Sequence, residues 1–176
     1  MRTVSLSFRD ARPEDAGRLT EIGRDTFSET FGMLYRHEDL QAYLDEYFTP
    51  EKQLAEIEDP DTEIRIAVMR AKTIAYAKLG PVKLPIEHDP ATSLELHRLY
   101  VRQEGQGVGV GRILLTWAVE QARQRGAKNI YLGVWENNQR AISVYETRNF
   151  EAIGNYQFPV GNAMDNEVIM RKSLEY

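Results

Sequence analysis

The segment that decides the fold is Leu94–Arg125, which reads LELHRLYVRQEGQGVGVGRILLTWAVEQARQR. Its first eight residues, Leu94–Val101, contain no glycine or proline to interrupt a strand and suit a buried strand. Four glycines then fall within the nine residues Gln103–Gly111. Apolar residues recur on one helical face after them, and Gly126 stands where a helix ends in a left-handed residue. The segment therefore predicts a strand, a glycine-rich turn and a helix.

This glycine-rich turn predicts an anion site, because backbone N–H groups converge where such a loop enters a helix. Two common phosphate patterns fail here. Counting G-x-G-x-x-G from Gly107 puts Arg112 at the third glycine, and no G-K-[ST] is present. The stretch that does occur, QGVGVG, follows Q-x-x-G-x-G instead. The alternative is a glycine-rich turn with no ligand.

Length, charge and apolar content limit the number of domains and the kinds of partner. The length of 176 residues suits a single domain spanning 1–176. A formal net charge of −5, without a lysine or arginine run, argues against nucleic acid as a partner. No apolar run reaches membrane length and no signal-peptide core is present, so we expect no membrane association and a cytoplasmic location. The sequence leaves a homodimer open.

The chain contains no cysteine, which excludes disulfides, thiolate metal sites and a cysteinyl acyl-enzyme intermediate. Its three histidines share no metal-ligand spacing, so no metal is expected.

The other elements follow from periodicity. Apolar alternation predicts further strands at Val4–Arg9, Glu63–Met69, Thr73–Leu79, Asn129–Val134, Phe150–Asn155 and Glu167–Leu174. Helices are predicted at Pro13–Phe31, Glu38–Phe48, Pro50–Ile57 and Ala141–Thr147, with an exposed loop at Pro81–Thr92. This order indicates an α/β or α+β protein with a largely antiparallel sheet and one parallel crossover. Pattern alone does not decide among such folds.

A second motif, VWENNQRAISVYETRNF, spans Val134–Phe150. Ala141 and Tyr145 are four residues apart and share a helical face, with Asn138 about two turns before Tyr145. A small residue such as Ala141 lets a ligand approach the helix closely. A phenol with a pKa of about 10 can donate a proton to a leaving thiolate. The alternative for Tyr145 is a core tyrosine.

Together the two motifs resemble those of the GNAT family of N-acetyltransferases. Its Q-x-x-G-x-G loop binds the pyrophosphate of acyl-CoA, and its second element reads V-x-x-x-N-x-x-A-I-x-x-Y-x-x-x-G-F. Asn149 stands where the family usually has glycine, but asparagine tolerates the left-handed conformation. The resemblance implies a mixed, mostly antiparallel central sheet of about seven strands flanked by helices. In that fold, the strands matching Leu94–Val101 and Asn129–Val134 splay apart to form the acyl-CoA cleft.

The resemblance also implies acetyl-CoA as co-substrate, without a metal. The residues that it assigns to the cofactor are Leu99, Tyr100, Val101, Gln106, Gly107, Val108, Gly109, Val110, Gly111, Arg112, Asn138, Ala141 and Tyr145.

Without a cysteine nucleophile, the simplest reaction is direct attack of a bound amine on the thioester. Tyr145 is the expected general acid, and backbone N–H groups of Leu99–Val101 are expected to polarise the carbonyl. Glu95 and His97 lie two residues apart on one strand face, so either could be the base. Family members often carry glutamate at the position of His97. A water chain is the alternative base.

The acceptor site is expected in FSETFGMLYRHEDLQAYLDEYF, where carboxylates stand among aromatic residues. That composition suits a small-molecule amine, with Glu29 and Tyr35 as candidate substrate residues, although acidic helix surfaces would look similar. The combination of ETFxxxY, LExxRxYV and GVWExN resembles the bacterial polyamine (spermidine/spermine) branch of the family. Other acceptors, such as a protein N-terminus, an amino acid or an antibiotic, stay open, as does a catalytically silent acyl-CoA-binding regulator.

Overall fold

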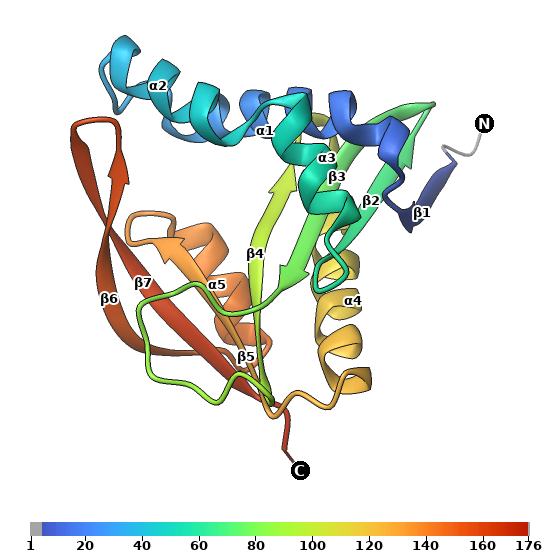
Figure 1. Ribbon diagram of the computed structural model, residues 1–176, viewed down its shortest axis with the longest axis vertical. Coiled ribbons are helices and arrows are strands. Elements are labelled where there is room, and N and C mark those ends of the chain that lie inside the picture. Colours follow the sequence, from blue (N-terminus) through green and yellow to red (C-terminus); the bar gives the residue numbers. More distant parts are fainter. Residues whose placement is uncertain (1–4, 176) are drawn as a thin grey trace.

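A computed structural model describes residues 5–175 as one seven-stranded sheet and five α-helices (Figure 1). The strands lie in the order β1-β2-β3-β4-β5-β7-β6, and every neighbouring pair is antiparallel except β4 and β5. The strands are β1 (Leu6–Asp10), β2 (Glu63–Met69), β3 (Lys72–Gly80), β4 (Ser93–Val101), β5 (Asn129–Trp135), β6 (Glu151–Val160) and β7 (Ala163–Ser173). The helices are α1 (Ala16–Phe31), α2 (His37–Tyr47), α3 (Pro50–Glu58), α4 (Val110–Gln124) and α5 (Gln139–Thr147).

The helices cover opposite faces of the sheet. Helices α4 and α5 pack on one face, where buried residues such as Leu114 and Ala118 meet Leu96 and Leu132 of the strands. Helix α1 covers the other face, with Leu19 and Ile22 against β2 and β3. Helix α2 closes the end of that face, where it meets α1 and the end of β6 in a mainly aromatic cluster, which is Phe27, Tyr43, Leu44, Phe48 and Val160.

The parallel pair β4 and β5 separates soon after it forms. It pairs only over Ser93–Glu95 and Asn129–Tyr131, and the two strands then diverge (Figure 1). Lys78 of β3 is opposite Arg98 and its successor is opposite Leu96, so His97 is the extra residue of a β-bulge. A bulge bends its strand and re-aims the side chains beside it. Beyond Glu95, the β4 edge that faces β5 therefore has no ladder partner.

The predicted fold class is confirmed: the sheet is mixed, mostly antiparallel and seven-stranded, with one splayed parallel pair. The predicted strand from Val4 begins outside the described residues, and β1 runs from Leu6 to Asp10. The predicted strand and helix ranges elsewhere agree with the structure to within a few residues, apart from the last hairpin.

The last two strands are much longer than the sequence indicated. We predicted strands ending at Asn155 and restarting at Glu167, but β6 continues to Val160 and β7 begins at Ala163. Polar residues in 161–166 hide the alternation there. Tertiary contacts stabilise this extension, since Asp39 of α2 accepts a hydrogen bond from the Asn162 N–H at 2.9 Å.

Candidate active site

A cavity of about 800 Å³ occupies the gap between β4 and β5. Residues from both sides of the sheet line it. One half is formed by the loop before α4 together with α5, and we call it the cofactor half. The other half is formed by α1, α2, β6 and β7, and we call it the acceptor half. The two halves meet where the strands diverge, so one ligand could enter from each side.

The glycine-rich loop of the cofactor half has the backbone geometry of an anion site. Gly107 and Gly109 have φ of 81° and 85°, in the left-handed region that glycine adopts without strain. Gly109 is the N-cap of α4 and provides no side-chain cap. The N–H groups of the first turn are therefore available to a phosphate, which the helix dipole also attracts.

The residues assigned to the cofactor from sequence line the cavity with one exception, although Tyr100 packs against Phe48 and Tyr76 on the acceptor side. Val108 is 54% exposed and does not line the cavity. Arg140 of α5, which the sequence analysis missed, donates a hydrogen bond to Gln106 Oε1 at 3.3 Å and so links α5 to the loop. The assigned residues that do line the cavity are Leu99, Tyr100, Val101, Gln106, Gly107, Gly109, Val110, Gly111, Arg112, Asn138, Ala141 and Tyr145.

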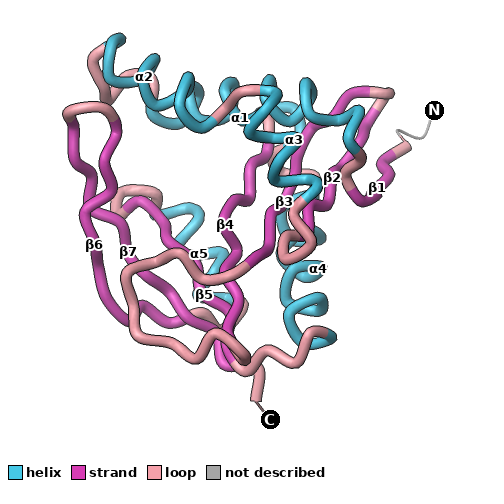
Figure 2. The backbone as a smooth tube through the Cα atoms, in the orientation of Figure 1, coloured by secondary structure: helices cyan, strands magenta, loops and turns pink. Residues whose placement is uncertain are grey.

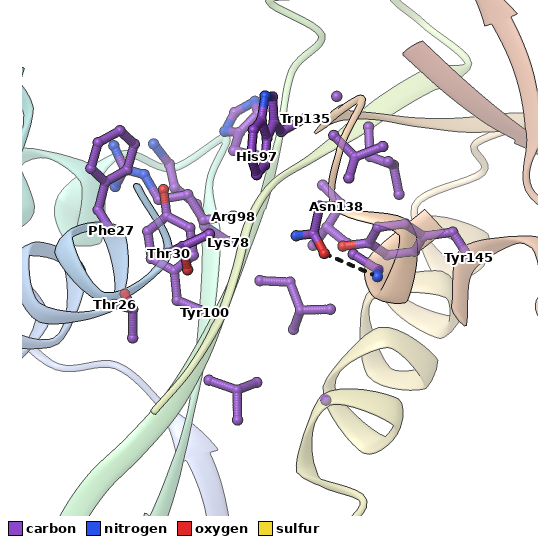
Figure 3. A pocket seen from close by; sticks show the side chains of 18 of the residues that line it. Thr26, Phe27, Thr30, Lys78, His97, Arg98, Tyr100, Trp135, Asn138 and Tyr145 are labelled. Atoms are coloured by element: carbon purple, nitrogen blue, oxygen red, sulfur yellow. Dashed lines mark hydrogen bonds between the residues drawn. The ribbon is translucent and has the colours of Figure 1, made fainter. Parts of the chain in front are cut away.

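Asn138 and Tyr145 both project from the α5 region toward β4 (Figure 3). Asn138 caps α5, since its Oδ1 accepts a hydrogen bond from the Ala141 N–H at 3.2 Å. The Tyr145 ring packs edge-on against Phe150, with 5.7 Å between centroids. Burial raises the pKa of Tyr145 to about 12, so the hydroxyl keeps its proton at neutral pH. Asn149, with φ of 66°, takes the left-handed conformation expected for the turn after α5.

Glu95 and His97 lie side by side on the acceptor half, with 3.8 Å between Glu95 Oε2 and His97 Nε2. Glu95 Oε2 accepts hydrogen bonds from the N–H groups of Lys83 at 2.6 Å and Leu84 at 3.2 Å. Burial raises the pKa of Glu95. Both residues thus contact the loop formed by residues 81–92, which Figure 2 shows reaching from β3 toward β5 and β7 before it returns to β4.

His97 is a neutral imidazole at physiological pH. Its Nε2 lies 2.6 Å from the carbonyl oxygen of Pro81, which can only accept, so Nε2 carries the proton. Within the described chain, Nδ1 is buried without a hydrogen-bond partner. Burial, with a smaller effect from the charge of Lys78, lowers the pKa of His97 to about 4.

The acceptor half is lined mainly by aromatic rings. Tyr35 lines it as predicted, whereas Glu29 is exposed on α1 and lies outside the cavity lining. The aromatic lining residues are Phe27, Phe31, Tyr35, Tyr43, Tyr47, Tyr100, Trp135, Tyr156 and Phe158. Aromatic faces attract cations, so this lining suits an ammonium or a methylene chain that carries one.

A buried ion cluster lies on the same side. Glu56 of α3 accepts from Lys78 Nζ at 2.8 Å and from Arg98 Nη1 at 2.8 Å. Burial lowers the pKa of Lys78 to about 8. The guanidinium of Arg98 also lies over the Phe48 ring, 4.8 Å from its centroid. Both carboxylate oxygens of Glu56 are therefore already paired with a cation.

Two further carboxylates line the acceptor half, and the sequence analysis missed both. Glu167 accepts a hydrogen bond from the Tyr156 hydroxyl at 2.6 Å. Asp165 lies two residues before it on β7, so both face the same side of the strand. Asp165, Glu167 and Ile169 stand at alternate positions in the sequence, and this alternation is the pattern that could have indicated their common strand face. It was hidden because the predicted strand began only at Glu167.

Residues 5–175 contain no group of three or more His, Cys, Asp or Glu side chains arranged to hold a metal ion. None of the helices in this part of the chain has the length and apolar character needed to cross a membrane.

The splayed parallel pair, the glycine loop at the start of α4 and the tyrosine facing the gap agree with the N-acetyltransferase class that the two sequence motifs indicated. Comparison of the sequence with known families agrees, since residues 21–150 match the Acetyltransferase (GNAT) family. The chain belongs to this family.

Several relatives cover almost the whole chain. A spermidine N(1)-acetyltransferase from Thermoplasma acidophilum is 26% identical over 172 residues, covering 98% of this chain and 99% of its own. An uncharacterized N-acetyltransferase in the pepI 3′ region of Lactobacillus delbrueckii subsp. lactis is 27% identical over 161 residues, covering 92% of this chain and 93% of its own.

Solved structures share the fold. The crystal structure of PaiA N-acetyltransferase from Thermoplasma acidophilum in complex with coenzyme A superposes with a TM-score of 0.77 at 24% identity. That match covers 96% of this chain and 99% of that one. The structure of YncA from Salmonella typhimurium with acetyl-CoA gives a TM-score of 0.68 at 21% identity, covering 97% and 94% of the two chains.

Proposed function

We propose that this protein transfers the acetyl group of acetyl-CoA to a primary amine of a polyamine such as spermidine. The observation that carries the proposal is a single cavity with two chemically different halves that meet between β4 and β5. One half has an anion-binding loop, and the other has aromatic rings and carboxylates suited to a long cation. The spermidine N(1)-acetyltransferase of Thermoplasma acidophilum, which is similar over nearly the whole chain, supports the choice of acceptor.

The cofactor half fits acetyl-CoA, which supplies the activated acyl group. The N–H groups of Gly109–Arg112 would hold its pyrophosphate at the start of α4. The unpaired β4 edge beyond Glu95 offers N–H and C=O groups to the amides of the pantetheine arm, since buried backbone groups need partners. A backbone N–H of Leu99–Val101 would polarise the acetyl carbonyl.

The leaving sulfur of CoA must gain one proton, and the ammonium nitrogen of the acceptor must lose two. The amine nitrogen attacks the carbonyl carbon, the C–N bond forms and the C–S bond breaks. Tyr145 would give its proton to the leaving sulfur, and a pKa of about 12 keeps that proton in place beforehand. Because the chain has no cysteine to form a cysteinyl acyl-enzyme, we expect direct transfer within a ternary complex. His97, Glu95 and a water chain are the bases that the sequence suggested.

An amine panel with acetyl-CoA tests this function. Free CoA thiol is measured, and the protein adds no background because it has no cysteine. We expect turnover with spermidine and spermine, and higher KM values for monoamines of similar length. Turnover confined to an amino acid, an antibiotic or a peptide N-terminus would replace the polyamine proposal. No turnover with any amine would favour the regulatory alternative.

A further inference from the structure

We propose that Glu167 binds the ammonium of the acceptor and takes its proton before the acetyl group is transferred. This inference rests on the proposed function only in requiring that the acceptor is an amine.

The carboxylate of Glu167 lies where the gap between β4 and β5 opens. Glu167 on β7 is opposite Trp135 on β5 and Tyr156 on β6. A Cβ added to Gly133 would lie 2.7 Å from Glu167 Oε2, so the carboxylate rests directly over the β5 backbone at this glycine. The last β5 residue paired with β4 is Tyr131. The carboxylate thus lies two residues beyond the point of divergence, at the boundary between the two halves.

The bonds of Glu167 leave its charge uncompensated. Its one hydrogen bond to a side chain in residues 5–175 comes from the neutral Tyr156 hydroxyl, at 2.6 Å, and no lysine or arginine there forms an ion pair with it. Glu56 nearby is instead paired with two cations. A largely buried carboxylate without a cation is costly, and an ammonium supplied by the substrate would compensate it.

The two bases predicted from sequence both hold the loop formed by residues 81–92. Glu95 Oε2 accepts two N–H groups of this loop. His97 donates from Nε2 to Pro81; its Nδ1 has no partner within the described chain, but burial lowers the pKa of His97 to about 4, which makes Nδ1 a weak base. Both side chains therefore fix the loop beneath the site. Asp165, two residues before Glu167 on β7, also has a buried oxygen without a partner in the described chain, but Glu167 is the carboxylate that lies over Gly133 beside the point of divergence.

The proton balance is complete without another reactant. One proton of the ammonium passes to a Glu167 oxygen, and the freed lone pair forms the C–N bond. The C–S bond breaks with its electron pair going to sulfur, which takes the Tyr145 proton. The second proton lost from nitrogen restores Tyr145, and the proton on Glu167 passes to solvent. The products are the acetamide, CoA thiol and one released proton.

Glu167→Gln tests the role, because glutamine keeps the shape but can neither accept the proton nor pair with the ammonium. We expect kcat/KM for spermidine to fall by about 100-fold or more, with the Kd for CoA changed by less than about twofold. The matched control is Glu151→Gln, an exposed carboxylate on β6 that should stay within twofold. A loss smaller than tenfold in E167Q overturns the proposal.

Tyr156→Phe provides a readout that a purely structural role would not move. Burial raises the pKa of Glu167, the Tyr156 hydrogen bond opposes this, and Glu95 and Asp165 add to the rise. Removing the hydroxyl should shift the acid limb of kcat/KM upward by roughly half to one pH unit. An unshifted limb overturns the proposal, and this variant decides the matter if E167Q fails to bind CoA. The titratable groups that act electrostatically on or with Glu167 are Tyr43 of α2, Glu95 and Tyr100 of β4, Tyr156 of β6 and Asp165 of β7.

The same variants separate this inference from the proposed function. If another amine replaces spermidine as the substrate, E167Q is assayed with that amine and the thresholds above apply. If no amine turns over, the proposed function fails, and calorimetry of spermidine binding to the CoA-loaded protein then tests Glu167. Binding that weakens at least tenfold in E167Q supports an ammonium site. Equal binding in both proteins, or binding in neither, overturns it.

Discussion

The two halves of the cavity are built by different means. The cofactor half is formed largely by backbone: left-handed glycines, the N–H groups at the start of α4 and the unpaired edge of β4. The acceptor half is formed by side chains from α1, α2, α3 and the long β6–β7 hairpin. Backbone geometry accepts any ligand with the same phosphate, whereas side chains can be exchanged without disturbing the fold. One half can therefore keep a common cofactor while the other changes its acceptor.

Tyr145→Phe should give the largest effect, because Tyr145 lies where the halves meet. Without the hydroxyl the leaving sulfur has no donor, and we expect kcat to fall about 100-fold with the Kd for CoA within twofold. The measurement is thiol release at saturating substrates. Tyr131→Phe is the control and should keep the full rate, since Tyr131 on β5 is not among the residues that line the cavity. A Tyr145→Phe variant with the full rate would sink the general-acid assignment.

His97 should make the acceptor half sensitive to acid. Its pKa is about 4 in the folded chain against about 6.5 when unfolded, so the unfolded state binds more protons between these values. The stabilisation is complete above pH 6.5 and is lost as the pH falls toward 4. We expect a loss of about 2 kcal/mol in the free energy of unfolding between pH 7 and pH 5.

Urea unfolding at the two pH values measures this loss. His97→Gln should remove most of the pH dependence, and His37→Gln on α2 should retain it. If the loss is the same in His97→Gln as in the unaltered protein, the neutral buried imidazole is not its cause.

Gly109→Val tests the backbone construction of the cofactor half. A β-branched residue at a φ of 85° is strained, at a cost of roughly 1–3 kcal/mol. We expect the Kd for CoA to rise about tenfold or more, while acceptor KM measured at saturating acetyl-CoA changes little. Gly154→Ala is the control, because no atom lies within 4 Å of an added Cβ there and its φ is not positive. Unchanged CoA affinity in Gly109→Val would mean that the loop does not hold the pyrophosphate.

Arg140→Ala should have the smallest effect. Its hydrogen bond to Gln106 is long, at 3.3 Å, and exposed, so its loss should cost about 0.5 kcal/mol. We expect CoA dissociation to accelerate two- to threefold in stopped-flow measurements. Ser143→Ala, exposed on the same helix, should leave the rate unchanged. An equal rate in both variants would show that the hydrogen bond between Arg140 and Gln106 does not slow CoA release.

Most residues that the sequence assigned to the cofactor line one cavity, because the signals that pointed to them are local. Glycines at positive φ, the cap at Asn138 and the spacing of Ala141 and Tyr145 each lie within one short segment. Val108 was the exception, since alternation within the loop turns it toward solvent. The acceptor half was predicted poorly, with Tyr35 in the cavity lining but Glu29 outside it.

By itself, the sequence determined the order of strands and helices, the glycine loop and the tyrosine on α5, since each depends on periodicity or on a residue's own φ preference, and the resemblance of its motifs to the GNAT family indicated the seven-stranded sheet. Only the tertiary structure decided the rest. The bulge at His97, the bonds that occupy Glu95 and the placement of Glu167 over Gly133 depend on residues from three or more separate elements. Whether a carboxylate is paired or free follows from the neighbours that folding brings to it, and those neighbours lie far away along the chain.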